Sequence, residues 1–246
     1  MSSLKKFASA GLLLLTFLLL QPAESFAHTN PDKHKNRPHS RALTRAEVKE
    51  AEQRLSEMGY GSTRSALIIF QKWEGRKVTG QLNREEYEAI MNATAPQAKD
   101  SGYKHVEVDL DRQVLLLTDE DGAIKKMLPV STGSNKQYHE KGMSGLAYTP
   151  RGRFRIYAKI SGWRKSPLGL LYYPNYFSDG LAIHGNPAVP HTPQSHGCVR
   201  IPMSASVEMS KELELGTIVL IYDTQSFVSA KDWAEADKQK HEAIVR

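Results

Sequence analysis

The sequence predicts a mainly β domain, folded as a sheet sandwich, preceded by a small domain of three helices. Apolar residues recur at helical spacing between residues 43 and 94, and from about residue 102 they alternate with polar residues as in strands. The chain has 246 residues, 40% hydrophobic and 24% charged, which excludes a collagen-like or wholly disordered protein. This length allows one medium domain and a small companion, with enough residues to bury a core.

Residues 1–27 have the pattern of a secretory signal peptide. Lys5 and Lys6 give a positive start, residues 10–20 form an apolar run, and Ser25-Phe26-Ala27 is a small-x-small cleavage site. The alternative is an uncleaved anchor, but the apolar run is short against the roughly 20 residues of a spanning helix. We therefore expect cleavage after Ala27, and no membrane span afterwards.

Residues 28–41 (HTNPDKHKNRPHSR) have no apolar period and many cations, as expected of a basic linker. Together with the signal peptide, this segment predicts an exported protein, periplasmic or associated with the cell wall.

The charge and cysteine content narrow the possible partners. The 33 Lys and Arg residues against 27 Asp and Glu give a net charge of +6, which suits an acidic polymer but falls short of a nucleic-acid-binding signature. The single cysteine, Cys198, excludes an intrachain disulfide and a Cys-rich zinc framework. We expect no nucleic-acid partner, and a thiol that acts alone if it acts at all.

The small N-terminal domain is predicted to span residues 42–95. Thr44 and Glu47 form a capping box for a first helix that ends at Gly59. A second helix runs from about Thr63 to Trp73, and a third begins at Asn83. Three short amphipathic helices must pack on one another to bury their apolar faces.

Within this domain, VKEAEQRLSEMGY, SALIIFQKWEG and TGQLNREEYEAI resemble the three-helix peptidoglycan-binding module of cell-wall enzymes. The Asp-Gly loop that this family places between its first two helices is missing, because Gly61 runs almost directly into Ser62-Thr63. The resemblance implies binding to the wall. A helical spacer with the same apolar core is the alternative.

The main domain is predicted to span residues 102–223. Asp121-Gly122 marks a hairpin turn, and a helix capped by Ser204 runs from about Met203 to Leu215. The remaining segment, residues 224–246, is rich in charged residues and is predicted to form a helical tail. The expected strands are 106–110, 114–117, 124–130, 153–160, 181–184 and 217–222.

The segment 181–202, LAIHGNPAVPHTPQSHGCVRIP, brings together an unusual set of reactive side chains: His184, His191, His196, Cys198 and Arg200. If residues 195–201 are extended, the side chains at 196, 198 and 200 share one face and Val199 turns into the core.

A nucleophilic thiol needs a base or a cationic neighbour, because near its ordinary pKa it is mostly protonated at neutral pH. His184 is the candidate base, and the carbonyl of Gly185 could hold its ring N–H and fix the tautomer. Gly197 leaves room for backbone N–H groups to approach an oxyanion. Arg200 suits a substrate carboxylate.

Other interpretations of these residues remain. Cys198 could be an incidental buried thiol, and the three histidines with Cys198 could bind zinc, although their spacing fits no common zinc pattern and zinc would not require Gly197 or Arg200. His191, in a proline-rich loop, is expected to be solvated. The aromatic residues just upstream are expected in the core or a pocket wall: Tyr172, Tyr173, Tyr176 and Phe177.

The pattern HGN…SHGCVRIP resembles the signature of L,D-transpeptidases of the YkuD type, over about residues 103–223. The resemblance implies an L,D-transpeptidase-like β-sandwich with Cys198 as nucleophile, His184 as base and the Gly185 carbonyl as the orienting group. It assigns Ser195, His196, Gly197 and Arg200 to substrate and oxyanion binding. Asn186 stands where many members have Thr, and the gap from His to Ser is shorter than in many members.

The family resemblance also implies the reaction. Its members use a cysteine acyl-enzyme on peptidoglycan tetrapeptide stems, release D-alanine and form 3→3 cross-links, and carbapenem-type inhibitors are possible ligands. We expect no metal or other cofactor. Two alternatives stay open: a carboxypeptidase that passes the acyl group to water, and a non-catalytic peptidoglycan-binding protein.

Overall fold

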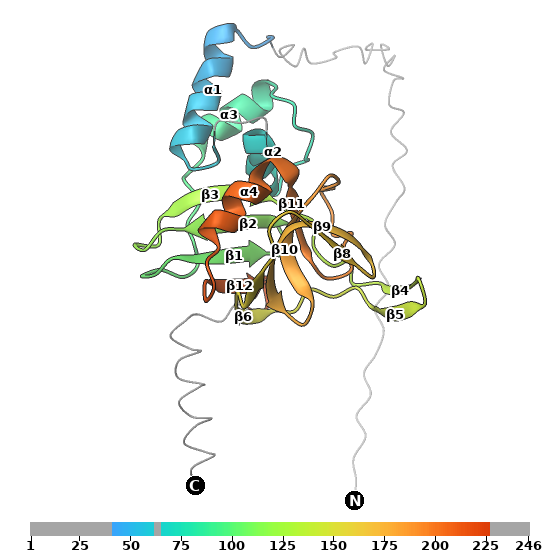
Figure 1. The fold of residues 1–246 in the computed structure, drawn as a ribbon. Coiled ribbons are helices and arrows are strands. Elements are labelled where there is room, and N and C mark those ends of the chain that lie inside the picture. Colours follow the sequence, from blue (N-terminus) through green and yellow to red (C-terminus); the bar gives the residue numbers. More distant parts are fainter. Residues whose placement is uncertain (1–40, 62–64, 227–246) are drawn as a thin grey trace, which may run out of the picture. The chain divides into compact units, whose positions relative to one another are not determined.

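The computed structural model describes residues 41–61 and 65–226, which contain four helices and twelve strands (Figure 1). Among these residues, no helix has the length and apolar character needed to cross a membrane. The predicted signal peptide, nearly all of the linker and most of the C-terminal tail lie outside the described residues. The helices are α1 (Arg45–Glu57), α2 (Ser65–Trp73), α3 (Arg84–Asn92) and α4 (Met203–Glu212).

Two five-stranded sheets and one two-stranded hairpin form the β domain. The first sheet has the order β3 (Ile124–Pro129), β2 (Val114–Thr118), β1 (His105–Asp109), β12 (Ile218–Tyr222) and β6 (Gly152–Arg155). The second has the order β11 (Val199–Pro202), β10 (Leu181–Asn186), β9 (Gly169–Ser178) and β7 (Ala158–Lys159), and β8 (Trp163–Ser166) pairs with β9. The hairpin consists of β4 (Gln137–Glu140) and β5 (Met143–Leu146).

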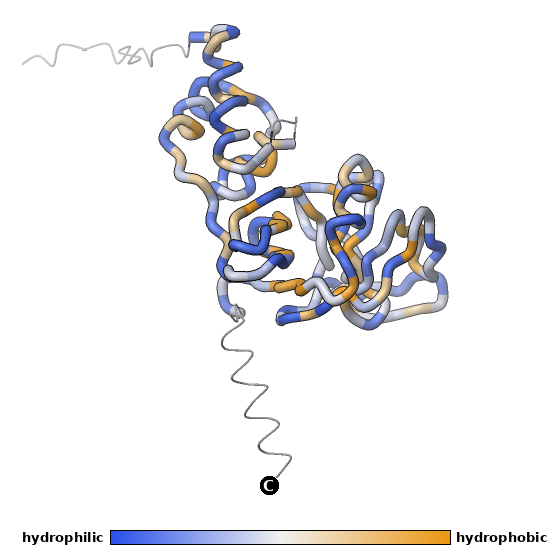
Figure 2. Tube along the Cα trace, turned by 60° about the vertical axis from the view of Figure 1, so that its left-hand side comes forward, coloured by the Kyte–Doolittle hydropathy of each residue, from blue (hydrophilic) through white to orange (hydrophobic). Residues whose placement is uncertain are grey.

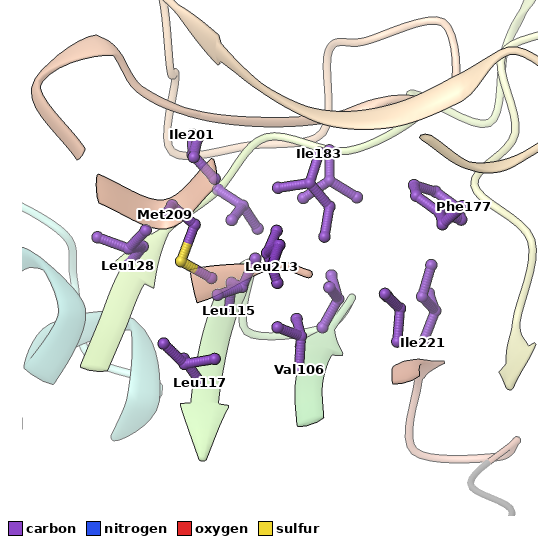
Figure 3. Close-up of a cluster of buried hydrophobic side chains, with 14 of the residues drawn as sticks. Val106, Leu115, Leu117, Leu128, Phe177, Ile183, Ile201, Met209, Leu213 and Ile221 are labelled. Atoms are coloured by element: carbon purple, nitrogen blue, oxygen red, sulfur yellow. The ribbon is translucent and has the colours of Figure 1, made fainter. Parts of the chain in front are cut away.

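The core of the sandwich lies between the two sheets. Figure 3 shows Val106, Leu115 and Ile221 from the first sheet facing Ile183 and Ile201 from the second. Helix α4 adds Met209 to the same cluster, and Leu213, the residue at its C-cap, also joins it; both are fully buried. This core confirms the predicted mainly β sandwich and fixes β10 and β11, which carry the candidate site, against the first sheet.

Strand β2 is buried on both faces, and this joins the helices to the sandwich. Leu115 and Leu117 point into the sandwich core, whereas Val114 and Leu116 pack with the apolar side chains of α1, α2 and α3 in a second cluster. A strand covered on both sides has no solvent face, which explains the unbroken apolar run VLLL over residues 114–117. Along the helices, Figure 2 shows hydrophilic residues interspersed with the apolar ones that form this cluster.

The predicted start of the first and third helices is confirmed. Thr44 caps α1 in a full capping box with Glu47, and the Asn83 side chain caps α3 by accepting from the Glu86 amide. The predicted start of α4 at about Met203 is also confirmed, but the predicted cap, Ser204, is wrong. The N-cap is Pro202, which makes no side-chain cap, and the helix ends at Glu212 rather than Leu215.

One strand prediction also needs correction, and several strands were not predicted. The single strand expected over 153–160 is two strands, β6 and β7, in different sheets, because Ile156 N donates to Thr217 O while Tyr157 N donates to Tyr176 O. The chain therefore crosses between the sheets at Ile156-Tyr157. Strands β4, β5, β8 and β9 were not among the predicted elements.

Candidate active site

A pocket of about 330 Å³ opens at the end of β10 and the start of β11. His184 lines it from β10, while Cys198 and Arg200 line it from the segment entering β11. Strands β10 and β11 run parallel with Ile183 opposite Val199 and His184 opposite Arg200, so Cys198 lies beside the strand that carries His184. The fold thus brings the predicted nucleophile, base and guanidinium into one pocket.

The His184 ring is held in one tautomer. Its Nδ1 lies 2.9 Å from the Gly185 carbonyl oxygen, and since a carbonyl only accepts, Nδ1 carries the hydrogen and Nε2 is left as an acceptor. The side chain is buried. Burial lowers the pKa of His184 to about 4, the Gly185 bond acts in the opposite direction, and Arg200 lowers the pKa further. The resting imidazole is therefore neutral at pH 7 and able to accept a proton.

Gly185 has a second role that depends on its missing side chain. A Cβ atom at this position would lie 2.6 Å from Ser206 Oγ and 2.7 Å from Ser206 Cβ. Helix α4 can pack this closely on β10 only because residue 185 is glycine. The carbonyl that orients His184 therefore lies where two elements are in tight contact.

The thiol of Cys198 is also neutral at rest. Burial raises its pKa, while a bond from the Ala182 backbone and the charge of Arg200 act in the opposite direction. Two neutral partners favour a mechanism in which the proton moves from sulfur to His184 during attack, rather than a preformed thiolate and imidazolium pair.

Ser195 organises the turn before the nucleophile. Its hydroxyl donates to Cys198 O at 2.5 Å and accepts from Gly197 N at 3.0 Å. Its backbone is fixed by Thr132, whose carbonyl accepts from Ser195 N at 2.8 Å, and by Ser134 N, which donates to Ser195 O at 3.0 Å. Ser195 also lines the pocket, so one residue both borders the site and shapes the turn that presents Cys198.

The Gly197 N–H donates to Ser195 Oγ within this segment. That Gly197 leaves room for backbone N–H groups to approach an oxyanion stays a prediction. The structure gives a further reason for a glycine here. Its φ is +140°, and a Cβ would lie 2.7 Å from the carbonyl oxygen of Tyr148. Gly197 therefore lets the segment at Tyr148 pack against the turn.

The expected extension over 195–201 holds only from Val199 onward, where β11 begins. Ser195 instead pairs with Gly133 in an isolated bridge, and residues 196–198 form a bend; we call residues 195–198 the nucleophile turn. The predicted sidedness is nevertheless confirmed: His196, Cys198 and Arg200 all line the pocket, and Val199 is fully buried.

Arg200 is a half-buried cation in the pocket. Within the described part of the chain, no carboxylate forms an ion pair with it, so its guanidinium is available to an anionic group of a ligand. Burial lowers its pKa, whereas the Cys198 sulfur acts in the opposite direction.

His196 is held from the hairpin of β4 and β5. Its Nε2 lies 3.3 Å from Glu140 Oε1, and the Tyr138 ring meets its ring edge-on with 4.7 Å between centroids. Tyr138 and Met143 of this hairpin also line the pocket, and neither was among the predicted site residues. Lys141 and Gly142 form the two-residue turn of this hairpin, with positive φ at both residues. Gly142 is the one feature of the sequence that could have indicated it.

The remaining candidates lie elsewhere. His191 is exposed in the loop after β10 and does not line the pocket. Burial and the charge of Lys72 lower its pKa. Phe177 is part of the sandwich core, as predicted, and Tyr172, Tyr173 and Tyr176 are partly buried on β9. Within residues 41–61 and 65–226, no group of three or more His, Cys, Asp or Glu side chains could hold a metal ion.

Comparison with known proteins identifies the domain that carries this site. The family profile of the L,D-transpeptidase catalytic domain, YkuD, matches residues 103–221. The crystal structure of the L,D-transpeptidase from Xylanimonas cellulosilytica is similar, with 33% identity and a TM-score of 0.66 over 74% of this chain and 94% of that one. That of an L,D-transpeptidase from Stackebrandtia nassauensis has 23% identity and a TM-score of 0.46, over 74% and 92%. No curated protein matches the chain. The chain belongs to the YkuD family of L,D-transpeptidase catalytic domains.

Proposed function

We propose that this protein is an exported L,D-transpeptidase that forms 3→3 cross-links between peptidoglycan stem peptides through an acyl-enzyme on Cys198. The observation that carries the proposal is the shared pocket of Cys198, His184 and Arg200, with the His184 tautomer set by the Gly185 carbonyl. A lone thiol beside an oriented neutral imidazole is suited to acyl transfer.

In the first half-reaction, Cys198 Sγ attacks the carbonyl carbon of the amide that precedes the terminal D-alanine of a tetrapeptide stem. The thiol proton passes to Nε2 of His184, the nitrogen left free by the Gly185 bond. The C–N bond then breaks, and His184 returns the proton to the departing D-alanine amine. The product is a thioester on Cys198, with the stem shortened by one residue.

In the second half-reaction, an amine of another stem attacks the thioester carbon and gives its proton to His184. The thiolate of Cys198 leaves and takes that proton back, so atoms and charge balance. Arg200 binds a carboxylate of the donor stem, and Ser195 holds the turn in place while the sulfur is acylated and released. His196 and Tyr138 border the bound stem.

Incubation with purified tetrapeptide muropeptides, followed by mass spectrometry, tests the proposal. We expect D-alanine release and 3→3 linked dimers from the wild type, and neither from Cys198→Ala with unchanged thermal unfolding. Shortened stems without dimers would assign the protein as a carboxypeptidase. Sacculus binding without turnover would assign it as a non-catalytic wall protein.

Acylation of Cys198 by a carbapenem gives a second readout. The thiol lines an open pocket, so we expect one covalent adduct in the intact mass spectrum and none with Cys198→Ala. An unmodified wild-type mass after prolonged incubation would contradict the proposed reactivity of this thiol.

A further inference from the structure

Lys72, on α2, is a buried cation outside the pocket. Only 5% of the residue is exposed, and its Nζ donates to the carbonyl oxygens of Gln113 at 3.0 Å and Val130 at 3.2 Å. In the described ranges no carboxylate forms an ion pair with it. Burial lowers its pKa to about 8. A lysine held only by carbonyls loses much of its hydration, so packing alone does not explain a cation here.

The two carbonyls that bind Lys72 lie at the ends of β2 and β3. Gln113 precedes β2 with a φ of +53°, a left-handed conformation that few side chains adopt. Its buried amide group is fully used: Nε2 donates to Leu110 O at 2.7 Å and Thr132 Oγ1 at 2.8 Å, and Oε1 accepts from Thr132 N at 2.9 Å. Lys72 therefore binds the backbone of the residue that clamps Thr132.

The segment of Thr132 in turn holds the nucleophile turn. Ser195 N donates to Thr132 O at 2.8 Å, and Ser131 exchanges two backbone bonds with Arg200 at 3.0 and 3.1 Å. Ser131 Oγ also donates to Thr192 O at 2.8 Å. From Ser195, one further hydrogen bond reaches Cys198 O. Both ends of the turn that presents Cys198 are thus bonded to the strand end that Lys72 binds.

We propose that Lys72 is a positioning residue for Cys198, and that the helical segment is therefore a working part of the catalytic unit. By tying α2 to the carbonyls of Gln113 and Val130, Lys72 fixes the strand ends on which Thr132, Ser195 and the nucleophile turn are built. The expected effect of Lys72 on the cross-linking rate rests on the proposed function. Its expected effect on the burial and reactivity of the Cys198 sulfur does not.

The test compares two substitutions on the same helix. Lys72→Met keeps the apolar stem and nearly the length of the side chain but removes the ammonium group and both of its hydrogen bonds. Ile69→Val is the control, because Ile69 is 1% exposed in the same apolar cluster but has no polar side-chain atom. Because Cys198 is the only cysteine, the rate of iodoacetamide alkylation measured against pH reports on this sulfur alone.

With Lys72→Met, we expect the turn to loosen and Cys198 to lose part of its burial. The midpoint of the alkylation profile should fall toward that of an ordinary thiol by about half a pH unit or more, because burial raises the resting value. The kcat for cross-linking should fall about tenfold or more, since displacement of a reacting atom carries a large rate penalty. Ile69→Val should change neither.

The proposal is overturned if folded Lys72→Met has the same alkylation midpoint as the wild type. It is also overturned if Ile69→Val shifts the midpoint as much as Lys72→Met does. If Lys72→Met does not fold, Thr132→Val replaces it in the test, because this variant breaks the hydrogen bond from Gln113 Nε2 to Thr132 Oγ1. Its alkylation midpoint must then fall as predicted for Lys72→Met. A wild type without cross-linking activity refutes the proposed function but leaves the alkylation comparison valid.

Discussion

The imidazole of His184 is both buried and hydrogen-bonded to a carbonyl, and of these two influences burial has the larger effect on its pKa. The pKa of about 4 means that the ring stays neutral well into the acidic range. A neutral ring can accept the thiol proton, whereas a protonated ring cannot. The burial that keeps His184 uncharged therefore makes it usable as a base at every pH above this value.

The pH dependence of kcat/KM follows from this burial. As pH falls, activity should hold through 6.5, where a solvated histidine would already be half protonated, and decline only near pH 4. A rate profile from pH 3.5 to 8 with muropeptide substrate measures the acid limb. A limb near 6.5 would show that His184 is solvated or is not the base.

The sequence revealed only part of the role of Gly197. The motif of residues 195–198 showed that this glycine lies beside the candidate nucleophile. The packing of the Tyr148 carbonyl against it depends on a distant loop, which no local sequence pattern reveals. Its amide, by contrast, has a local acceptor, the hydroxyl of Ser195 two residues earlier.

Gly197→Ala should destabilise the protein by about 2–4 kcal/mol, because the new Cβ meets a backbone carbonyl at a positive φ. Gly162→Ala is the matched control: Gly162 also has a positive φ of +78°, but nothing lies within 4 Å of its Cβ position. We expect a loss of about 1 kcal/mol there. Urea unfolding of both variants measures the difference, and equal losses would contradict the role given to Tyr148.

At the scale of elements, the elements predicted correctly are those with unbroken patterns. Strands β1, β2, β3 and β10 show clear apolar periodicity or runs, and the helices α1 and α3 carry their caps in sequence. Strand β9 was missed because Pro174 and Asn175 interrupt its pattern and its pairing with β10 shifts register. The hairpin of β4 and β5 is mostly exposed, so it has little apolar period to detect.

This hairpin should influence substrate binding. Tyr138→Ala removes a pocket wall and the ring that contacts His196, and we expect KM for the muropeptide to rise about two- to tenfold, the range of a lost aromatic contact. Tyr157→Ala is the control, because Tyr157 is exposed and does not line the pocket. Steady-state kinetics of both variants measure KM. An unchanged KM in Tyr138→Ala would show that the hairpin does not contribute to substrate binding.

At the scale of the whole described chain, helices and sandwich share a strand. Leu116 belongs to the cluster under the helices and Leu117 to the sandwich core, although they are neighbours on β2. The sequence predicted both units, but their junction could not be foreseen, because an apolar run does not say what covers each face.

Leu116→Ala and Leu117→Ala should therefore act on one cooperative unfolding transition. Each removes a fully buried side chain, and we expect each to cost about 2–5 kcal/mol and to lower the same Tm in calorimetry of the full chain. Two separate transitions, each lowered by only one of the variants, would show that the helices and the sandwich unfold independently.

Among the described residues no carboxylate pairs with the Arg200 guanidinium, and this has a practical consequence for assays. A half-buried cation with no carboxylate partner in the described part of the chain attracts small anions from the medium as well as the carboxylate of the proposed substrate. Citrate, phosphate and sulfate should then act as weak competitive inhibitors. Rates measured in buffers that contain them will underestimate the activity of the enzyme. A buffer whose only charged form is a tertiary ammonium, at low chloride, is the better medium for measuring the activity.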